Sequence, residues 1–360
     1  ASGAEEQEII EKIDIGGISL IRAAAKNFKD VVIVPSQNEY IPLLNHLNEK
    51  NGEFSLSERK WFAGRAFSVS SHYDAAIFGY FNGGADESTE RISLNNGAVL
   101  RYGENPHQKA TFFKFKNTPQ QVSLADARVI QGKALSYNNM LDADAAWKSA
   151  SDAYHSVTHI QNKVAVSVIK HLNPCGLAVT GNILESLELA WEGDPISAFG
   201  SIICFTDTVN KEVAEWFGSK FVEIVIATKF TPEALEVFAG KKNLRLLETP
   251  VKSEITGEKL YRSISGGMLV QDEDEGLDLQ FETVTKKAFD AGKMNLAKFG
   301  ITACKHLKSN AIAVVTENAN GSFWLTGAGM GQPNRLDSLR QLTMPRFSMK
   351  NGLEIANSVL

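Results

Sequence analysis

The sequence predicts an α/β fold, in which helices pack against sheets. Two observations support this prediction. Short apolar runs rich in β-branched residues alternate with amphipathic helical segments, and several of these runs end in polar turns that contain glycine or proline. No repeat of fixed period and no low-complexity tract interrupts the pattern. The chain has 360 residues, which is enough for two or three domains with cores of their own.

The composition excludes several functional classes. Hydrophobic residues make up 43% and charged residues 22% of the chain, as in ordinary soluble globular proteins. The net charge is −5, so binding of nucleic acid through bulk positive charge is not expected. No apolar run reaches the ~18 residues of a membrane span, and the acidic start does not resemble a signal peptide. We therefore expect a reduced, cytoplasmic protein that binds neither nucleic acid nor membrane.

The first ninety residues are expected to be mostly helical. Helices are predicted at 5–12, 18–28, 41–50 and 56–81, and a short buried strand at 30–36. Asp14, Gly16 and Gly17 precede the second helix, and Lys26 lies within it. Backbone N–H groups at such a glycine-to-helix junction can hold an anion, although a tight turn before a helix also favours glycine. A domain boundary is predicted at 82–90, where glycine and small polar residues cluster.

The remaining chain alternates strands with helices. Asn96-Gly97 predicts a hairpin turn, and residues 110–116 predict a strand. Buried strands are predicted at 162–172, 196–205, 221–227 and 310–317, with helices at 142–157 and 182–192 between them.

The strand at 162–172 ends in the strongest candidate site. Lys170 and His171 lie at its end, and Asn173-Pro174 is expected to stop the strand. A lysine beside a histidine offers a cation and a base of near-neutral pKa, which suits general-base catalysis with charge stabilisation. The alternative is that Lys170 caps the sheet and His171 makes a structural hydrogen bond. Nothing in the local sequence indicates that Cys175 is an activated nucleophile.

Two cationic segments could hold an anionic ligand. Arg101, which precedes Tyr102 in a rigid polar loop, can bind a phosphate or carboxylate through two parallel hydrogen bonds. Lys241, Lys242 and Arg245 form the densest cationic stretch of the chain. A solvated basic face explains either segment equally well when each is taken alone.

No metal site is expected. Cys175, Cys204 and Cys304 are far apart and form no C-x-x-C motif. His155 and His159 are four residues apart, but the glutamate of H-E-x-x-H is missing between them. A solvent-facing helix is the better interpretation of this pair. The glycine-rich segment 326–335 matches neither a dinucleotide-binding nor a P-loop spacing.

Eight segments, taken in order, resemble the bifunctional purine-biosynthesis family of AICAR transformylase and IMP cyclohydrolase. They are LRYGENPHQKA, QGKALSYNN, KHLNPCGLA, DPISAFGSI, KKNLRLL, ISGGMLVQD, KSNAIAVV and GAGMGQPNRLDS. The resemblance runs from about residue 10 to the end of the chain.

The resemblance implies transfer of a formyl group from 10-formyltetrahydrofolate to the amine of AICAR ribotide, by a homodimer and without a metal. It also implies the fold. Two cytidine-deaminase-like α/β/α subdomains without zinc are expected at 91–245 and 246–360. The C-terminal part of a methylglyoxal-synthase-like cyclohydrolase domain is expected at 1–90, together with a helical linker.

The resemblance also implies roles for particular residues. Lys170, His171 and Asn310 match the catalytic positions, with His171 as the base and the other two as donors to the developing oxyanion. The residues that match substrate-binding positions are Arg101, Tyr102, Phe199, Lys242 and Asn173, and those that match a cyclohydrolase segment are Asp14, Gly16, Gly17 and Lys26.

By comparison with usual domain sizes, we expect the family's cyclohydrolase domain to begin about a hundred residues before this chain does. We also expect an aromatic-rich segment with a second phosphate-binding arginine to follow IANSVL in the family. A non-catalytic AICAR-binding relic, or a fragment of the bifunctional enzyme, is therefore the alternative interpretation. A zinc deaminase is not expected, because the chain has no H-x-E with P-C-x-x-C.

Overall fold

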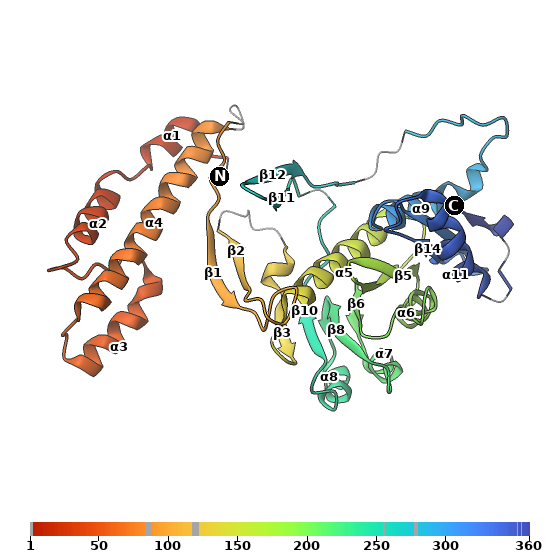
Figure 1. The fold of residues 1–360 in the computed structure, drawn as a ribbon, viewed down its shortest axis with the longest axis horizontal. Helices are drawn as coiled ribbons and strands as arrows, with labels where there is room; N and C mark the ends of the chain where they lie inside the picture. Colours follow the sequence, from red (N-terminus) through yellow and green to blue (C-terminus); the bar gives the residue numbers. More distant parts are fainter. Residues whose placement is uncertain are drawn as a thin grey trace. The chain divides into compact units, whose positions relative to one another are not determined.

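The computed structural model describes residues 3–83, 88–116, 122–254, 256–276, 280–350, 352–353 and 355–360. The chain forms two compact units. Unit 1 comprises Ala1–Gly97 and Phe113–Pro119, and unit 2 comprises Ala98–Phe112 and Gln120–Leu360. Figure 1 shows the course of the chain through both units. The predicted division of the second part at residue 245 stays a prediction.

Unit 1 is mainly helical, as predicted. Its helices are α1 (Glu6–Glu11), α2 (Gly16–Lys26), a 3₁₀ turn η1 (Gln37–Glu39), α3 (Tyr40–Lys50) and α4 (Leu56–Asn82). The long helix α4 begins at a capping box, in which Ser55 and Glu58 satisfy each other's backbone N–H groups, and it ends at Gly83 in the left-handed conformation. Small side chains let α2 and α4 pack closely, because Ala25, Ala63 and Ala66 are buried in one cluster.

Two predictions for this region are wrong. Residues 31–35 have no regular structure, and no strand pairs with them among the described residues. The β-branched run favours an extended chain, but a strand also needs a neighbour, and the surrounding segments are helical. Asn96-Gly97 forms no hairpin turn and lies inside β1 (Leu94–Val99), which pairs with β2 (Thr111–Phe115). There the glycine allows a close approach, because a Cβ on Gly97 would lie 2.6 Å from the Phe113 ring.

Unit 2 is an α/β structure, which confirms the predicted fold class. Its nine-stranded mixed sheet has the order β15-β13-β14-β5-β4-β6-β8-β10-β3. The strands are β3 (Arg128–Gln131), β4 (Val164–Lys170), β5 (Asn173–Thr180), β6 (Ser201–Phe205), β8 (Val222–Ala227), β10 (Arg245–Glu248), β13 (Ile312–Glu317), β14 (Phe323–Gly329) and β15 (Ser358–Val359). Strands β6, β8 and β10 are parallel, whereas the other pairs in the sheet are antiparallel.

The helices of unit 2 are α5 (Tyr137–Ser156), α6 (Ile183–Glu192), α7 (Lys211–Trp216), α8 (Pro232–Ala239), α9 (Met294–Lys305), α10 (Arg335–Asp337) and α11 (Met344–Ser348). A π-helical stretch joins the last two at Ser338–Thr343. Outside the main sheet, β7 (Thr208–Val209) pairs with β9 (Lys229–Phe230), and β11 (Lys259–Ile264) forms a hairpin with β12 (Gly267–Asp272).

Helices cover both faces of this sheet (Figure 1), which explains why its central strands are continuously apolar. Consecutive residues of β6 point to opposite faces of the sheet and join different cores. Ile202 packs in the cluster of α5, and Ile203 packs in the cluster of α6, α7 and α8. A third cluster joins α9 to β13 and β14. Among the described residues, no helix combines the length and apolarity required to cross a membrane.

The predicted strand at 162–172, with a stop at Asn173-Pro174, is only half right. Strand β4 ends at Lys170, but the chain reverses in a two-residue turn and Asn173 begins β5, which pairs antiparallel with β4. Pro174 tolerates this position because it lies beside a register irregularity, where a missing N–H disturbs the ladder least.

Candidate active site

The sheet topology brings the ends of distant segments to one edge. Strand β4 ends at Lys170, and β5 starts at the same edge because the two strands are antiparallel. The parallel strands β6, β8 and β10 also start there, since β6 is antiparallel to β4. Strand β13 starts there as well, because it is antiparallel to β14, which is in turn antiparallel to β5. Phe199, Lys242 and Asn310 each lie just before one of these starts.

His171 occupies the turn between β4 and β5. His171 and Leu172 have φ angles of 53° and 65°, so both lie in the left-handed region that this kind of two-residue turn requires. The side chain of Asn173 donates from Nδ2 to the carbonyl oxygen of His171 at 2.8 Å, and its Oδ1 accepts from the N–H of Lys308 at 3.1 Å. The turn is thereby tied to the loop that carries Asn310. The imidazole itself is exposed.

Lys170 is half-buried beside an exposed aromatic side chain. Its Nζ donates to the carbonyl oxygen of Gly200 at 2.9 Å, which leaves two ammonium hydrogens for a ligand. Gly200 has a φ of 68°, and a Cβ there would lie 3.1 Å from both Nζ and the Phe221 ring. The preceding residue, Phe199, is 66% exposed and leans on Phe221, with ring centroids 5.2 Å apart.

Asn310 is fixed by backbone carbonyls. Its Nδ2 donates to the carbonyl oxygens of Gln332 at 2.8 Å and Pro333 at 3.0 Å. An amide group has two N–H donors, so both are used in this conformation. The donor role that the resemblance implies for Asn310 therefore requires its amide to leave these carbonyls.

The side chains of Arg101 and Tyr102 bind each other. The guanidinium lies over the Tyr102 ring at 4.8 Å and donates from Nη2 to the phenol oxygen at 2.9 Å. Backbone bonds from Arg101 to Leu135 and from Tyr137 to Tyr102, both 3.2 Å, hold this loop against the start of α5. The Arg101 side chain is exposed and keeps several N–H donors for an anion.

The cationic stretch 241–245 separates into three different environments. Lys241 donates from Nζ to the backbone carbonyls of Gly218 and Lys220. Arg245 is 2% exposed and binds Glu223 at 2.8 Å and the carbonyl oxygen of Lys133 at 3.1 Å. Lys242 is exposed, and no bond of its side chain is found among the described residues. Of the three, only Lys242 is placed to bind a ligand.

The basic loops are linked through the segment after β3. The carbonyl of Lys133 accepts from Arg245, and the carbonyl of Leu135 accepts from the N–H of Arg101. Arg101 and the 241–245 stretch therefore border the same short segment, residues 133–135. The structure brings both phosphate-binding candidates to the β3 end of the site and Lys170 and His171 to its middle.

Cys175 is a buried thiol. It donates to the carbonyl oxygen of Val168 at 3.3 Å, and burial raises its pKa to about 12. A thiol held protonated in this way is a poor nucleophile at neutral pH.

Asp142 is a site residue that the sequence did not single out. Its Oδ1 accepts from the N–H of Leu172 at 2.8 Å. Burial raises the pKa of Asp142, against the opposing effects of this bond, His171 and Lys170. Asp142 lies in the helix α5, far from His171 in sequence, so no local pattern could indicate the contact.

In unit 1, the carboxylate of Asp14 accepts from the N–H groups of Gly17 and Ile18, each at 3.1 Å. The amides expected to hold an anion are thus already bound. Lys26 is the last residue of α2, about 15 Å along the helix axis from Gly16. The structure does not bring these residues together around one ligand.

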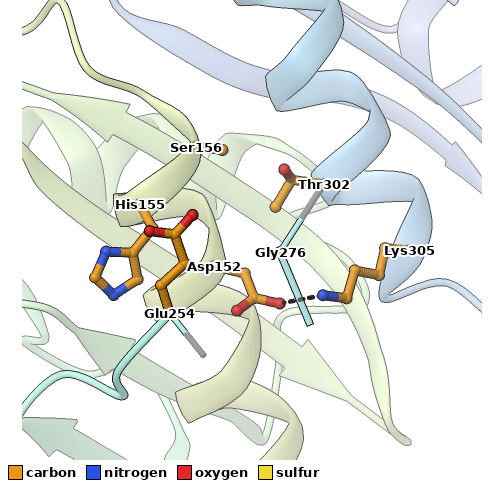
Figure 2. A pocket seen from close by; sticks show the side chains of 7 residues that line it. All are labelled: Asp152, His155, Ser156, Glu254, Gly276, Thr302 and Lys305. Carbon is orange, nitrogen blue, oxygen red and sulfur yellow. Dashed lines mark ion pairs between the residues drawn. The ribbon is translucent and has the colours of Figure 1, made fainter. Parts of the chain in front are cut away.

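One pocket among the described residues lies elsewhere, between α5 and α9 (Figure 2). It is lined by Asp152, His155, Ser156, Glu254, Gly276, Thr302 and Lys305. Asp152 points toward Lys305 (Figure 2) and pairs with Lys305 and His306, each at 3.0 Å. None of the predicted site residues lines this pocket.

The interpretation of His155 and His159 as a solvent-facing helical pair is only partly right. His159 is exposed, but it lies beyond helix α5, which ends at Ser156, and it packs on Phe323. His155 lies in α5 but is half-buried and bonds the carbonyl oxygen of Lys252 at 2.7 Å. Within the described ranges, no three His, Cys, Asp or Glu side chains are close enough together to hold a metal ion.

Comparison with known proteins identifies what the chain resembles. A family described as the AICARFT/IMPCHase bienzyme matches residues 24–344. The bifunctional purine biosynthesis protein PurH of Bacteroides thetaiotaomicron is 43% identical over 343 residues, which cover 95% of this chain and 63% of that protein. The PurH proteins of Bartonella bacilliformis and Leptospira biflexa are each 40% identical, covering 94% and 98% of this chain and 62% and 66% of theirs. The chain thus spans a little over three fifths of the length of these relatives.

Proposed function

The chain belongs to the AICARFT/IMPCHase bienzyme family, and from this premise we propose that it transfers a formyl group from 10-formyltetrahydrofolate to the amine of AICAR ribotide. The observation that carries the proposal is the position of Lys170 and His171. They lie at the same edge of the sheet as the exposed Phe199, Lys242 and the Arg101 loop.

Lys170 and His171 supply the chemistry. The amine nitrogen of AICAR attacks the formyl carbon, and His171 accepts the proton that this nitrogen loses. The two free hydrogens of the Lys170 ammonium can stabilise the oxyanion that forms on the formyl oxygen. The C–N bond to tetrahydrofolate then breaks, and the leaving nitrogen takes the proton that His171 had accepted, which returns His171 to its basic form. The buried Cys175 plays no covalent part.

The other exposed groups bind the nucleotide. Arg101 and Lys242 hold the phosphate, since both are exposed cations. Arg101 bonds Leu135, and Lys242 lies three residues before Arg245, which bonds the carbonyl oxygen of Lys133. Phe199 offers an aromatic face for the imidazole ring, and Tyr102 orients Arg101. Asn173 holds the His171 turn rather than the substrate, which assigns it a structural part in the site. Asn310 shapes the neighbouring loop and contributes a donor only when its amide is released.

We also propose a domain architecture for the chain. We assign residues 91–245 and 246–360 to two cytidine-deaminase-like subdomains without zinc. We assign residues 1–90 to the end of a cyclohydrolase domain, with Asp14, Gly16, Gly17 and Lys26, together with a helical linker. The protein is proposed to act in the cytoplasm as a homodimer. The exposed apolar side chains of the β11–β12 hairpin, Met268 and Leu269 among them, support an interface with a second copy.

A formyl-transfer assay with His171→Ala tests the function. We expect the parent chain to consume 10-formyltetrahydrofolate only when AICAR ribotide is present, and His171→Ala to lower this rate by about 100-fold or more. His155→Ala is the matched control, because His155 lines the α5–α9 pocket and bonds the carbonyl oxygen of Lys252, and this variant should retain the parental rate. No transfer by the parent chain, or equal rates in parent and His171→Ala, would contradict the proposal.

A further inference from the structure

The turn that carries His171 adopts an unfavourable backbone conformation. His171 and Leu172 both have positive φ, and neither is the glycine or asparagine that usually occupies such positions. The backbone therefore needs contacts from outside the turn to keep this geometry. Asn173 supplies one contact from within the hairpin, at the carbonyl oxygen of His171.

The contact from outside the hairpin comes from helix α5. The carboxylate of Asp142 accepts the Leu172 N–H at 2.8 Å, and its charge faces Lys170 and His171. Helix α5 is long and well anchored, with Ala143, Ala146 and Trp147 buried against the sheet. The acceptor is therefore held by a rigid element rather than by another loop.

We propose that Asp142 is a positioning residue for His171: its carboxylate fixes the left-handed turn through the Leu172 N–H and so holds the imidazole where it can take a proton from the substrate. This inference rests on the proposed function, because it assigns Asp142 a part in the same reaction. Asp142 needs no contact with the substrate for this role. Its loss should lower kcat, while the ribotide contacts of Arg101 and Lys242 keep KM unchanged.

The hydrogen bond between Asp142 and the Leu172 N–H can be tested without an activity assay. Burial raises the pKa of Asp142 above the 3.8 of an ordinary aspartate, so its carboxyl should take up a proton at higher pH than usual. In a ¹⁵N-labelled chain, we expect the Leu172 amide proton shift to follow that titration. The titration should vanish in Asp142→Asn and persist in Asp144→Asn, the matched control, whose side chain pairs with Lys148 instead. A Leu172 shift that does not titrate in the parent, or that titrates equally in Asp142→Asn, overturns the proposal.

Kinetics test the positioning role. Asp142→Ala should lower kcat by about 10- to 100-fold with KM for AICAR ribotide within twofold, as expected when a reacting group is misplaced. Adding Leu172→Gly to Asp142→Ala should raise kcat at least several-fold above that of Asp142→Ala alone, because glycine adopts positive φ without steric cost. Loss of kcat in Asp144→Asn, an unchanged kcat in Asp142→Ala, or no recovery by Leu172→Gly contradicts the role. A parent chain that transfers no formyl group refutes the proposed function alone, because the Leu172 titration still decides whether Asp142 holds the turn.

Discussion

Lys241, Lys242 and Arg245 carry the same charge, yet their surroundings give them different roles. Lys241 holds backbone carbonyls, Arg245 is buried against Glu223, and Lys242 is exposed. The sequence could identify the cationic stretch. It could not distinguish the roles of the three residues, because their burial and pairing depend on residues more than twenty positions away. For the same reason, the sequence did not indicate a role for Asp142, whose partner Leu172 lies thirty residues further along the chain.

Arg101→Ala should weaken the binding of AICAR ribotide much more than that of the dephosphorylated riboside. A guanidinium forms oriented, charge-assisted hydrogen bonds with a phosphate, and the riboside has no phosphate to lose. Calorimetric titration of both ligands measures the ratio. Arg128→Ala is the control, since this exposed arginine of β3 pairs with Glu248 of β10. Equal weakening of both ligands by Arg101→Ala would place the phosphate elsewhere.

Among the elements, helices with an amphipathic pattern were predictable, and strands were less so. The predicted helices at 41–50 and 56–81 match α3 and α4 closely, because such a pattern is a local property of the sequence. The strand predicted at 30–36 is absent and the Asn96-Gly97 turn lies inside β1, because strand formation depends on a partner that local sequence does not specify. Asn173-Pro174 was predicted to stop a strand and instead begins β5.

The contact between α5 and α9 should make stability depend on pH. Burial alone would raise the pKa of Asp152, but His306 and Lys305 outweigh it and hold the pKa below its ordinary value. A carboxyl whose pKa is lower in the folded state stabilises the fold above its unfolded pKa of about 3.9, and this contribution is lost as pH falls through the folded value. Asp152→Asn should therefore cost roughly 1–3 kcal/mol at pH 7, by leaving partly buried donors without their charged acceptor.

Urea unfolding of the parent and Asp152→Asn at pH 7 and at successively lower pH measures this difference. The two curves should converge as the pH drops below about 4. Glu215→Gln, which removes an exposed partner of Lys211, should change stability little at any pH. If Asp152→Asn lowers the free energy of unfolding by the same amount at every pH, the stabilisation does not come from the charge of Asp152.

At the scale of the whole molecule, the strand order explains how residues from 101 to 310 reach one edge of a sheet. The sequence motifs predicted which residues belong together, through their resemblance to a family. They did not predict the order β13-β14-β5-β4-β6-β8-β10-β3 that joins them, because non-local pairing leaves no trace in spacing. Nor could they show that Asp14 binds the amides of its own helix and that Lys26 lies at the other end of that helix.

The exposed apolar surface of unit 2 supports assembly of the chain into a homodimer. Exposed apolar side chains lie in the loop before β6, where Ile196 is 77% exposed, and on the β11–β12 hairpin. Apolar surface of this kind usually marks an interface. We expect light scattering at micromolar concentration to give twice the 39.4 kDa of one chain. A mass of one chain would contradict the proposed homodimer.

We propose that this sheet edge binds AICAR ribotide, with the phosphate at Arg101 and Lys242 and the amine at His171. A crystal structure of the chain with AICAR ribotide tests it most directly. We expect the phosphate within hydrogen-bond distance of Arg101, the imidazole ring against Phe199, and the amine within about 3.2 Å of the His171 ring. A ligand bound instead in the pocket beside Asp152, or with its phosphate away from Arg101 and its amine out of reach of His171, would contradict this binding mode.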